Sequence, residues 1–434
     1  MRLTHLSLHG YHGFRDLELA FPERGPTVLI GKNGAGKSTV LDAVAIFLGY
    51  FAALASHPPS RHKRGASVGL EIAADEVHRE ESGARVVALF SAGGRRLVGR
   101  AVHRDRSWNL GELLDTTPLD AFIYDTLLPA LAEDRQAPIP VLAYYRPNRG
   151  IGLELGKKAR PPAYPQLAAY VRALDAQVGP FQGFVRWFRL EEDRENEVRL
   201  RKDPRHRDRR LQAVRDAIER FLSALSPGTF RNLRAERDVD LDTGADLPAQ
   251  ILIDKGEISL PLSHLSDGER SMLLLVADLA MRLVVANPAA EEPLRGAGIV
   301  LIDEVELHLH PAWQRAVLPA LSAVFPGCQI IATTHSPQIL STLEPESVVI
   351  LESFRRVELT PPTYGRDTNA LLLEVMHTPP RPQQAADKLD RIARLIDAED
   401  YGGARAALDD LSGWLGDRDP EIVRLRALTE VLES

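Results

Sequence analysis

Residues 31–39 read GKNGAGKST, and this stretch constrains the fold more than any other in the chain. It matches the pattern G-x-x-x-x-G-K-[S/T]. The apolar run at residues 27–30 predicts a strand before it, and apolar residues around most of 40–48 predict a buried helix after it. A strand, a glycine loop and a helix in this order predict an α/β fold. A glycine-rich turn without a ligand is the alternative, and the full pattern in this context argues against it.

Such a loop suits the phosphates of a nucleotide. Glycines let backbone N–H groups converge on phosphate oxygens, and the helix N-terminus adds partial positive charge. We expect Lys37 to reach the β- and γ-phosphates of ATP, and the Ser38 hydroxyl to bind Mg²⁺. The other loop residues expected to contact the nucleotide are Asn33, Gly34, Ala35, Gly36 and Thr39.

Two later apolar runs end in polar residues. Residues 298–302 lead into Asp303 and Glu304, as in a buried parallel strand that presents carboxylates at its carboxyl end. We expect Asp303 to hold Mg²⁺ and Glu304 to orient or deprotonate the attacking water. The run at 330–332 leads to His335, which we expect to contact the γ-phosphate or that water. Each pattern is common alone and becomes specific after a phosphate loop.

Residues 265–270, LSDGER, stand at the start of a predicted apolar helix. Ser266 is a suitable N-cap, and Ser266 with Glu269 forms the spacing of a capping box. Capping alone does not explain Gly268, since glycine weakens a helix. The segment also offers N–H groups and a hydroxyl at a helix start, which predicts a second anion site. One ATP needs only one phosphate loop, so this second site indicates a partner subunit.

The four motifs, in this order, resemble the heads of ABC-type ATPases, in the branch that contains RecF and SMC proteins. The resemblance covers residues 1–60 and about 260–350. It implies a homodimer, or a higher oligomer built from it, in which Ser266, Gly268 and Glu269 of one subunit close on the ATP held by Lys37 of the other. Arg15, in the sequence HGFR, resembles a Phe-Arg stretch that lies beside the nucleotide in that branch.

Two features depart from the family pattern. His310 stands where the family usually has an aspartate, and the sequence ELHLHP at 306–311 resembles the AAA15/AAA21 subgroup, which includes overcoming-lysogenization-defect ATPases. A zinc site at Glu306, His308 and His310 is an alternative that lacks an evident fourth ligand. The family's Q-loop glutamine is also missing; Asn148 or Arg149 is the candidate, Gln136 a poorer one, and a plain turn the alternative.

The predicted fold class is α/β: a P-loop ABC-type ATPase head with an inserted helical lobe and a C-terminal helical tail. The head comprises residues 1–149, with the phosphate loop and an antiparallel sheet over 67–103, and residues 229–362. Residues 150–228 form the helical insertion, which is too short for an SMC coiled-coil arm. Residues 363–434 form a helical region that we expect to dock a partner.

The net charge of −7 excludes holding nucleic acid by bulk charge, so such binding would need a local patch. Arginines near 199–210 offer one, for direct binding or beside a partner, but interleaved acids favour a solvated face. The single cysteine, Cys328, suits a reducing cytoplasm. No uninterrupted apolar run reaches the roughly 18 residues of a membrane span, which predicts a cytoplasmic protein without a membrane association.

The tail supplies the remaining indication of function. The sequence YGRD at 364–367, followed by amphipathic helices, resembles ATPase subunits of Septu-type and retron-associated anti-phage systems, which work with a separately encoded HNH-type nuclease. The leading hypothesis is an ATPase that dimerises around ATP and regulates such a nuclease. A RecF-like DNA repair or maintenance ATPase is the alternative. A transporter subunit is disfavoured by the 225 residues between Thr39 and Leu265.

Overall fold

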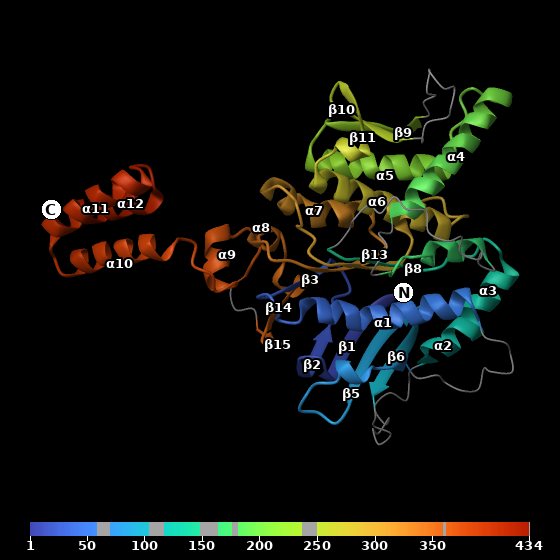
Figure 1. Ribbon diagram of the computed structural model, residues 1–434, viewed down its shortest axis with the longest axis horizontal. Helices are drawn as coiled ribbons and strands as arrows, with labels where there is room; N and C mark the ends of the chain where they lie inside the picture. The colour runs from blue at the N-terminus through green and yellow to red at the C-terminus, as the bar shows by residue number, and fades with distance from the viewer. Residues whose placement is uncertain are drawn as a thin grey trace. The chain divides into compact units, whose positions relative to one another are not determined.

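A computed structural model describes residues 1–58, 70–103, 117–147, 164–175, 181–236, 250–358 and 362–433. The chain divides into two compact units, Met1–Arg366 and Asp367–Ser434. The second unit begins four residues after the boundary expected at residue 363. Figure 1 shows the elements of both units.

A mostly parallel sheet forms the centre of the first unit. Its strand order is β15-β14-β3-β13-β12-β8, and only β15 pairs antiparallel. The strands predicted at 27–30 and 298–302 are confirmed, and every residue of β3, β8 and β12 is buried. The bounds are β3 (Thr27–Ile30), β8 (Val141–Tyr145), β12 (Gly298–Ile302), β13 (Cys328–Thr333), β14 (Val348–Glu352) and β15 (Arg355–Val357).

A second sheet has strand order β2-β1-β5-β6-β4, with β7 also paired to β6. Its long strands pair antiparallel, as predicted for 85–102, but β4 runs parallel to β6 and comprises only Leu70 and Glu71. The antiparallel prediction was therefore wrong for that stretch; alternation of side chains does not encode strand direction. The strands are β1 (Arg2–Tyr11), β2 (Phe14–Ala20), β4 (Leu70–Glu71), β5 (Ala84–Ala92), β6 (Arg95–His103) and β7 (Thr117–Pro118).

Helix α1 (Lys37–Ser56) lies between these two sheets (Figure 1) and contacts β5, β8 and β13. Val40, Val44 and Phe47 on it are fully buried, which confirms the predicted buried helix. It is also the one helix in the described residues with the length and hydropathy of a membrane span. Because it starts at the phosphate loop and packs between two sheets, it is a core helix.

The opposite face of the parallel sheet is covered by α6 (Asp267–Ala286) and α7 (Pro311–Val324), as Figure 1 shows. Helix α6 is buried almost all round, since α4, α5 and the short helix at Pro165–Tyr170 also pack on it. Shorter segments complete the layers: α2 (Leu119–Phe122), a π-helical turn (Ile123–Leu127), α3 (Leu128–Glu133) and α8 (Pro337–Leu340).

The insertion contains α4 (Phe181–Arg201) and α5 (Arg209–Leu225), followed by a small sheet of β9 (Phe230–Glu236), β10 (Gln250–Lys255) and β11 (Ile258–Pro261). The charged run that we expected to be helical is interrupted between α4 and α5, at a segment that contains Pro204. Phe184 and Phe188 of α4 are fully buried. These helices pack on α6 and α7 and belong to the first compact unit.

The second unit is helical, with α9 (Thr368–Glu374), α10 (Gln383–Asp397), α11 (Tyr401–Leu415) and α12 (Pro420–Glu433). Helices α10 to α12 enclose a small core of their own that includes Ile392, Leu408 and Leu425. The apolar stripes predicted for the tail supply this core, because Leu389 and Leu395 pack against it and Leu411 lies within it.

Candidate nucleotide site

The carboxyl edge of the parallel sheet collects three of the sequence motifs. The phosphate loop follows β3, Asp303 and Glu304 follow β12, and His335 lies two residues after β13. Because β12 and β3 both pair in parallel with β13, all three strands end at the same edge. Open α/β sheets bind their ligands at this edge.

The phosphate loop has the backbone that its glycines make available. Gly31, Gly34 and Gly36 have φ angles of 150°, 79° and 97°. A β-carbon at Gly36 would lie 2.5 Å from the ring of Phe14, and one at Gly31 would lie 2.1 Å from the carbonyl oxygen of Leu351. Glycine is therefore required there by conformation and by space.

Lys37 is only 7% exposed, and its Nζ donates to the carbonyl oxygens of Gly31 at 2.9 Å and Lys32 at 3.1 Å. Burial lowers the pKa of Lys37, and the carboxylates of Asp303, Glu304 and Glu306 oppose that shift. The ammonium group therefore lies in the field of the acids that follow β12. Ser38, on the first turn of α1, is exposed.

Thr333 joins the two acids to the neighbouring strand. Its hydroxyl donates to Oδ1 of Asp303 at 2.5 Å and accepts the backbone N–H of Glu304 at 2.8 Å. Glu304 has a φ of 49°, which turns the chain sharply after β12. Sequence reasoning gave Thr333 no role; its only signal was a polar residue at the end of an apolar strand.

His335 is tied to the same loop through Glu306. Its backbone N–H donates to Oε1 of Glu306 at 2.5 Å. Burial lowers the pKa of His335, Lys37 acts in the same direction, and the carboxylates of Glu306, Glu304 and Asp303 oppose it. The imidazole is therefore mainly neutral at pH 7, with one ring nitrogen able to donate and the other able to accept.

The donor set suits Mg²⁺ better than zinc. Magnesium prefers oxygen ligands and uses one or two carboxylates with substrate phosphates, which fits Ser38 and Asp303. The described residues contain no group of three or more His, Cys, Asp or Glu side chains able to hold a metal ion. His310 instead caps α7, where its Nδ1 accepts the backbone N–H of Ala312 at 3.3 Å. The zinc alternative at 306–310 was therefore wrong.

The capping box at the start of α6 is confirmed. Glu269 donates its backbone N–H to Oγ of Ser266 at 3.4 Å, and the N–H of Ser266 donates to Oε2 of Glu269 at 3.1 Å. A salt bridge from Lys255 at 2.7 Å holds the other oxygen of Glu269. A β-carbon at Gly268 would lie 2.3 Å from the carbonyl oxygen of His308, so close approach of this loop explains the glycine.

Ser266 is exposed, and α6 lies on the face of the parallel sheet opposite to α1 (Figure 1). Ser266 and Lys37 therefore lie at the starts of helices that pack on opposite faces of the parallel sheet. This arrangement leaves the hydroxyl of Ser266 open toward solvent or another molecule.

The structure separates the remaining candidates. Arg15 forms an ion pair with Glu80, and it is the adjacent Phe14 that packs against the phosphate loop. Asn148 and Arg149 lie outside the described residues. Gln136 lies before β8, at its amino end, so it cannot serve as the Q-loop residue.

Arg146 is the described residue that follows β8 at the nucleotide edge. Its Nη2 lies 2.8 Å from Oδ1 of Asp42 on α1, and its guanidinium lies over the ring of Tyr144 at 4.2 Å. The hydroxyl of Tyr144 also donates to Asp42, at 3.2 Å. Sequence reasoning overlooked Arg146, although it lies within the YYRPNR segment proposed for the Q-loop.

The arginines near 199–210 are largely engaged within the fold. The side chains of Glu191, Glu192 and Glu195 on α4 are buried, and Arg199, Arg210 and Arg215 form salt bridges with them. Arg201 pairs with Glu197 at 2.9 Å. Residues 201–210 are mainly exposed, as predicted for a solvated face, whereas Glu191, Glu192 and Glu195 face inward toward α5 and β9.

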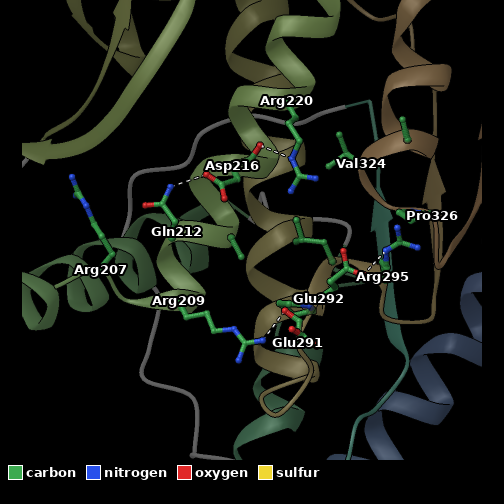
Figure 2. Close-up of a pocket in the computed structure, with 14 residues that line it drawn as sticks. Arg207, Arg209, Gln212, Asp216, Arg220, Glu291, Glu292, Arg295, Val324 and Pro326 are labelled. Atoms are coloured by element: carbon green, nitrogen blue, oxygen red, sulfur yellow. Dashed lines mark hydrogen bonds and ion pairs between the residues drawn. The ribbon is translucent and has the colours of Figure 1, made fainter. Parts of the chain in front are cut away.

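Figure 2 shows a hollow of about 440 Å³ beside α5 that also has mixed charge. Arg295 pairs with Glu292 at 2.9 Å, and Arg209 donates to the carbonyl oxygen of Glu291 at 2.7 Å. This hollow lies away from the residues that follow β3, β12 and β13, so it is separate from the nucleotide edge.

Comparisons with known proteins agree with the geometry of that edge. A family model described as "AAA domain, putative AbiEii toxin, Type IV TA system" matches residues 169–341, and an AAA domain model matches residues 5–116. The retron Ec83 probable ATPase of Escherichia coli is 26% identical over 98% of this chain and 86% of its own length. Together with the phosphate loop and the acids after β12, these matches indicate a P-loop ATPase.

The ATPase is also similar to the Septu protein PtuA of Bacillus mycoides, at 41% identity over 32% of this chain and 20% of the PtuA chain. Among solved structures, an SMC head bound to the C-terminal winged-helix domain of ScpA has 17% identity and a TM-score of 0.43, covering 83% of this chain and 98% of that one.

Proposed function

We propose that this ATPase hydrolyses Mg²⁺-bound ATP within a closed dimer and regulates a partner nuclease in anti-phage defence. One observation carries the proposal: Lys37 lies at the same edge of the parallel sheet as Asp303 and Glu304, whose carboxylates act on its charge. The retron and Septu relatives support the setting in defence.

Each residue at that edge has a chemical task. On binding ATP, Lys37 exchanges its bonds to loop carbonyls for the phosphates, which are stronger acceptors for an ammonium group. Ser38 and Asp303 would hold Mg²⁺, which supplies neutralisation of the developing charge. Glu304 orients or deprotonates the attacking water, and His335 contacts the γ-phosphate.

The exposed Ser266 supports the dimer. Its hydroxyl lies at the N-terminus of α6, a position that suits an anion, and α6 packs on the face of the parallel sheet opposite to α1, which begins at the phosphate loop. A two-fold arrangement would bring this group onto the γ-phosphate held by the second copy, and would do so at both sites.

Glu304→Gln tests the hydrolytic part. We expect ATP binding to persist and hydrolysis to fall by at least about a hundredfold, because the amide cannot take a proton from water. Light scattering should then detect an ATP-dependent dimer that persists. Hydrolysis at the wild-type rate by this variant would refute the role of Glu304.

Complementation between two inactive variants tests the sandwich. Lys37→Ala and Ser266→Arg should each abolish hydrolysis, while Ser266→Arg still binds ATP. In a mixed dimer one site combines both lesions and the other has neither, so an equal mixture should recover about a quarter of the wild-type rate if sites act independently. A mixture that stays inactive, although light scattering shows mixed dimers, would rule out contributions across the seam.

The C-terminal unit is the proposed docking region for a separately encoded HNH-type nuclease. Its helices expose Trp414, Val431 and Leu432 at 54%, 71% and 50%. Exposed apolar side chains on helices of this kind are typical of protein interfaces. Direct action on DNA, as in RecF-like repair, is less supported because Arg199 and Arg201 are paired within the fold.

A further inference from the structure

Glu306 lies three residues after Asp303, in a loop that also carries Glu304. Its Oε1 accepts the backbone N–H of His335. Its Oε2 is enclosed by protein and accepts no hydrogen bond from the described residues. A buried carboxylate oxygen without a donor is rare in folded proteins, and each instance calls for a reason.

The surroundings of Glu306 suggest what that oxygen serves. Lys37 donates to two loop carbonyls instead of to Glu306. Among the three carboxylates that act on His335, Glu306 has the largest effect on the pKa of the imidazole. The carboxylate therefore holds the main chain of the same residue whose ring it influences most among these acids.

We propose that Glu306 is a positioning residue for His335: Oε1 fixes the main chain, and when ATP is bound Oε2 accepts the imidazole N–H. A carboxylate that accepts one ring N–H fixes the tautomer of a histidine and aims the other nitrogen. Here it would turn that nitrogen toward the γ-phosphate. The proposal rests on the proposed function, since it deepens the role of His335 at that site.

Glu306→Gln separates the two tasks of the side chain. The glutamine carbonyl still accepts the backbone N–H of His335, but its NH₂ group cannot accept from the ring. We expect kcat to fall about tenfold or more, as for other residues that orient a reacting group. The KM for ATP and the melting temperature should stay as in wild type, and Glu257→Gln, on an exposed turn, should leave all three unchanged.

A double variant then shows whether Glu306 acts through His335. If it does, Glu306→Gln combined with His335→Ala should be no slower than His335→Ala alone. A wild-type kcat for Glu306→Gln, or losses that multiply in the double variant, would overturn the proposal. If kcat stays at the wild-type value, Glu306 only accepts the backbone N–H of His335.

Nitrogen NMR of the histidine rings tests the same contact without hydrolysis. With a non-hydrolysable ATP analogue bound, wild-type His335 should show a single tautomer, assigned through the missing signal of His335→Ala. Glu306→Gln should show a mixture of tautomers. Identical spectra would reject the role of Glu306, whereas a wild-type chain that never hydrolyses ATP, alone or with its partner, would reject the proposed function instead.

Discussion

Thr333 shows how much one buried hydroxyl organises at the nucleotide edge. It bonds both the carboxylate of Asp303 and the main chain of Glu304, so it fixes the two acids relative to β13. The sequence allowed prediction of the charged residues, because Lys37, Asp303 and Glu304 stand in patterns with a known spacing. It did not indicate Thr333 or Arg146, and it suggested only a zinc ligand at Glu306, because the roles of these residues depend on which strands become neighbours.

Thr333→Val should separate this role from packing, since valine has nearly the same shape. We expect kcat to fall about tenfold and stability to drop by about 1–3 kcal/mol, because the N–H of Glu304 loses its acceptor. Thr333→Ser keeps the hydroxyl and should retain most of the activity. Steady-state kinetics and thermal melting provide the measurements; equal activity of the valine and serine variants would contradict this role.

Among the elements, α6 carries an ion pair whose two side chains are almost fully buried, with exposed fractions of 2% and 0%. Arg282 Nε lies 2.7 Å from Oδ2 of Asp278, and the hydroxyl of Tyr145 on β8 donates to the same oxygen at 2.8 Å. Arg282 also donates to the carbonyl oxygen of Ala169 at 2.6 Å. These hydrogen bonds therefore connect α6, which begins after Ser266, to β8, which leads to Arg146.

Asp278→Asn should be strongly destabilising, by about 3–5 kcal/mol, because it leaves the buried guanidinium without a counter-charge. Glu292→Gln removes an ion pair that is 67–68% exposed and should change stability by less than about 0.5 kcal/mol. Thermal melting compares the two variants. Similar melting temperatures for both would show that the buried pair is not needed.

Sequence patterns predicted the helices and strands better than they predicted which side chains become buried. Apolar runs predicted the strands β3 and β12 at the bounds that the structure has. The sequence did not indicate that the acids at 191, 192 and 195 are buried, because their neighbours along the chain are charged too. They share one face of α4, and a face becomes buried only when α5 and β9 fold against it. That pairing is long-range information, which local composition does not contain.

At the scale of the whole molecule, the division at Asp367 is the main feature. The second unit has its own apolar core, so the two units should be separable. We expect residues 1–366 to bind ATP with the affinity of the full chain and to lose capture of the proposed HNH-type nuclease partner. Isothermal titration and co-purification measure the two properties. Capture by residues 1–366 at full strength would place the docking surface elsewhere.

The same division also splits the charge of the chain unevenly. Residues 367–434 contain 14 acids and 8 bases, a net charge of −6, so only −1 of the total −7 remains on residues 1–366. A head this close to neutral has little colloidal repulsion at pH 7 and tends to self-associate. The tail therefore supplies most of the net charge by which copies of the chain repel one another. A partner that covers the tail would screen this charge, and repulsion between complexes would then depend on the charge of the whole complex.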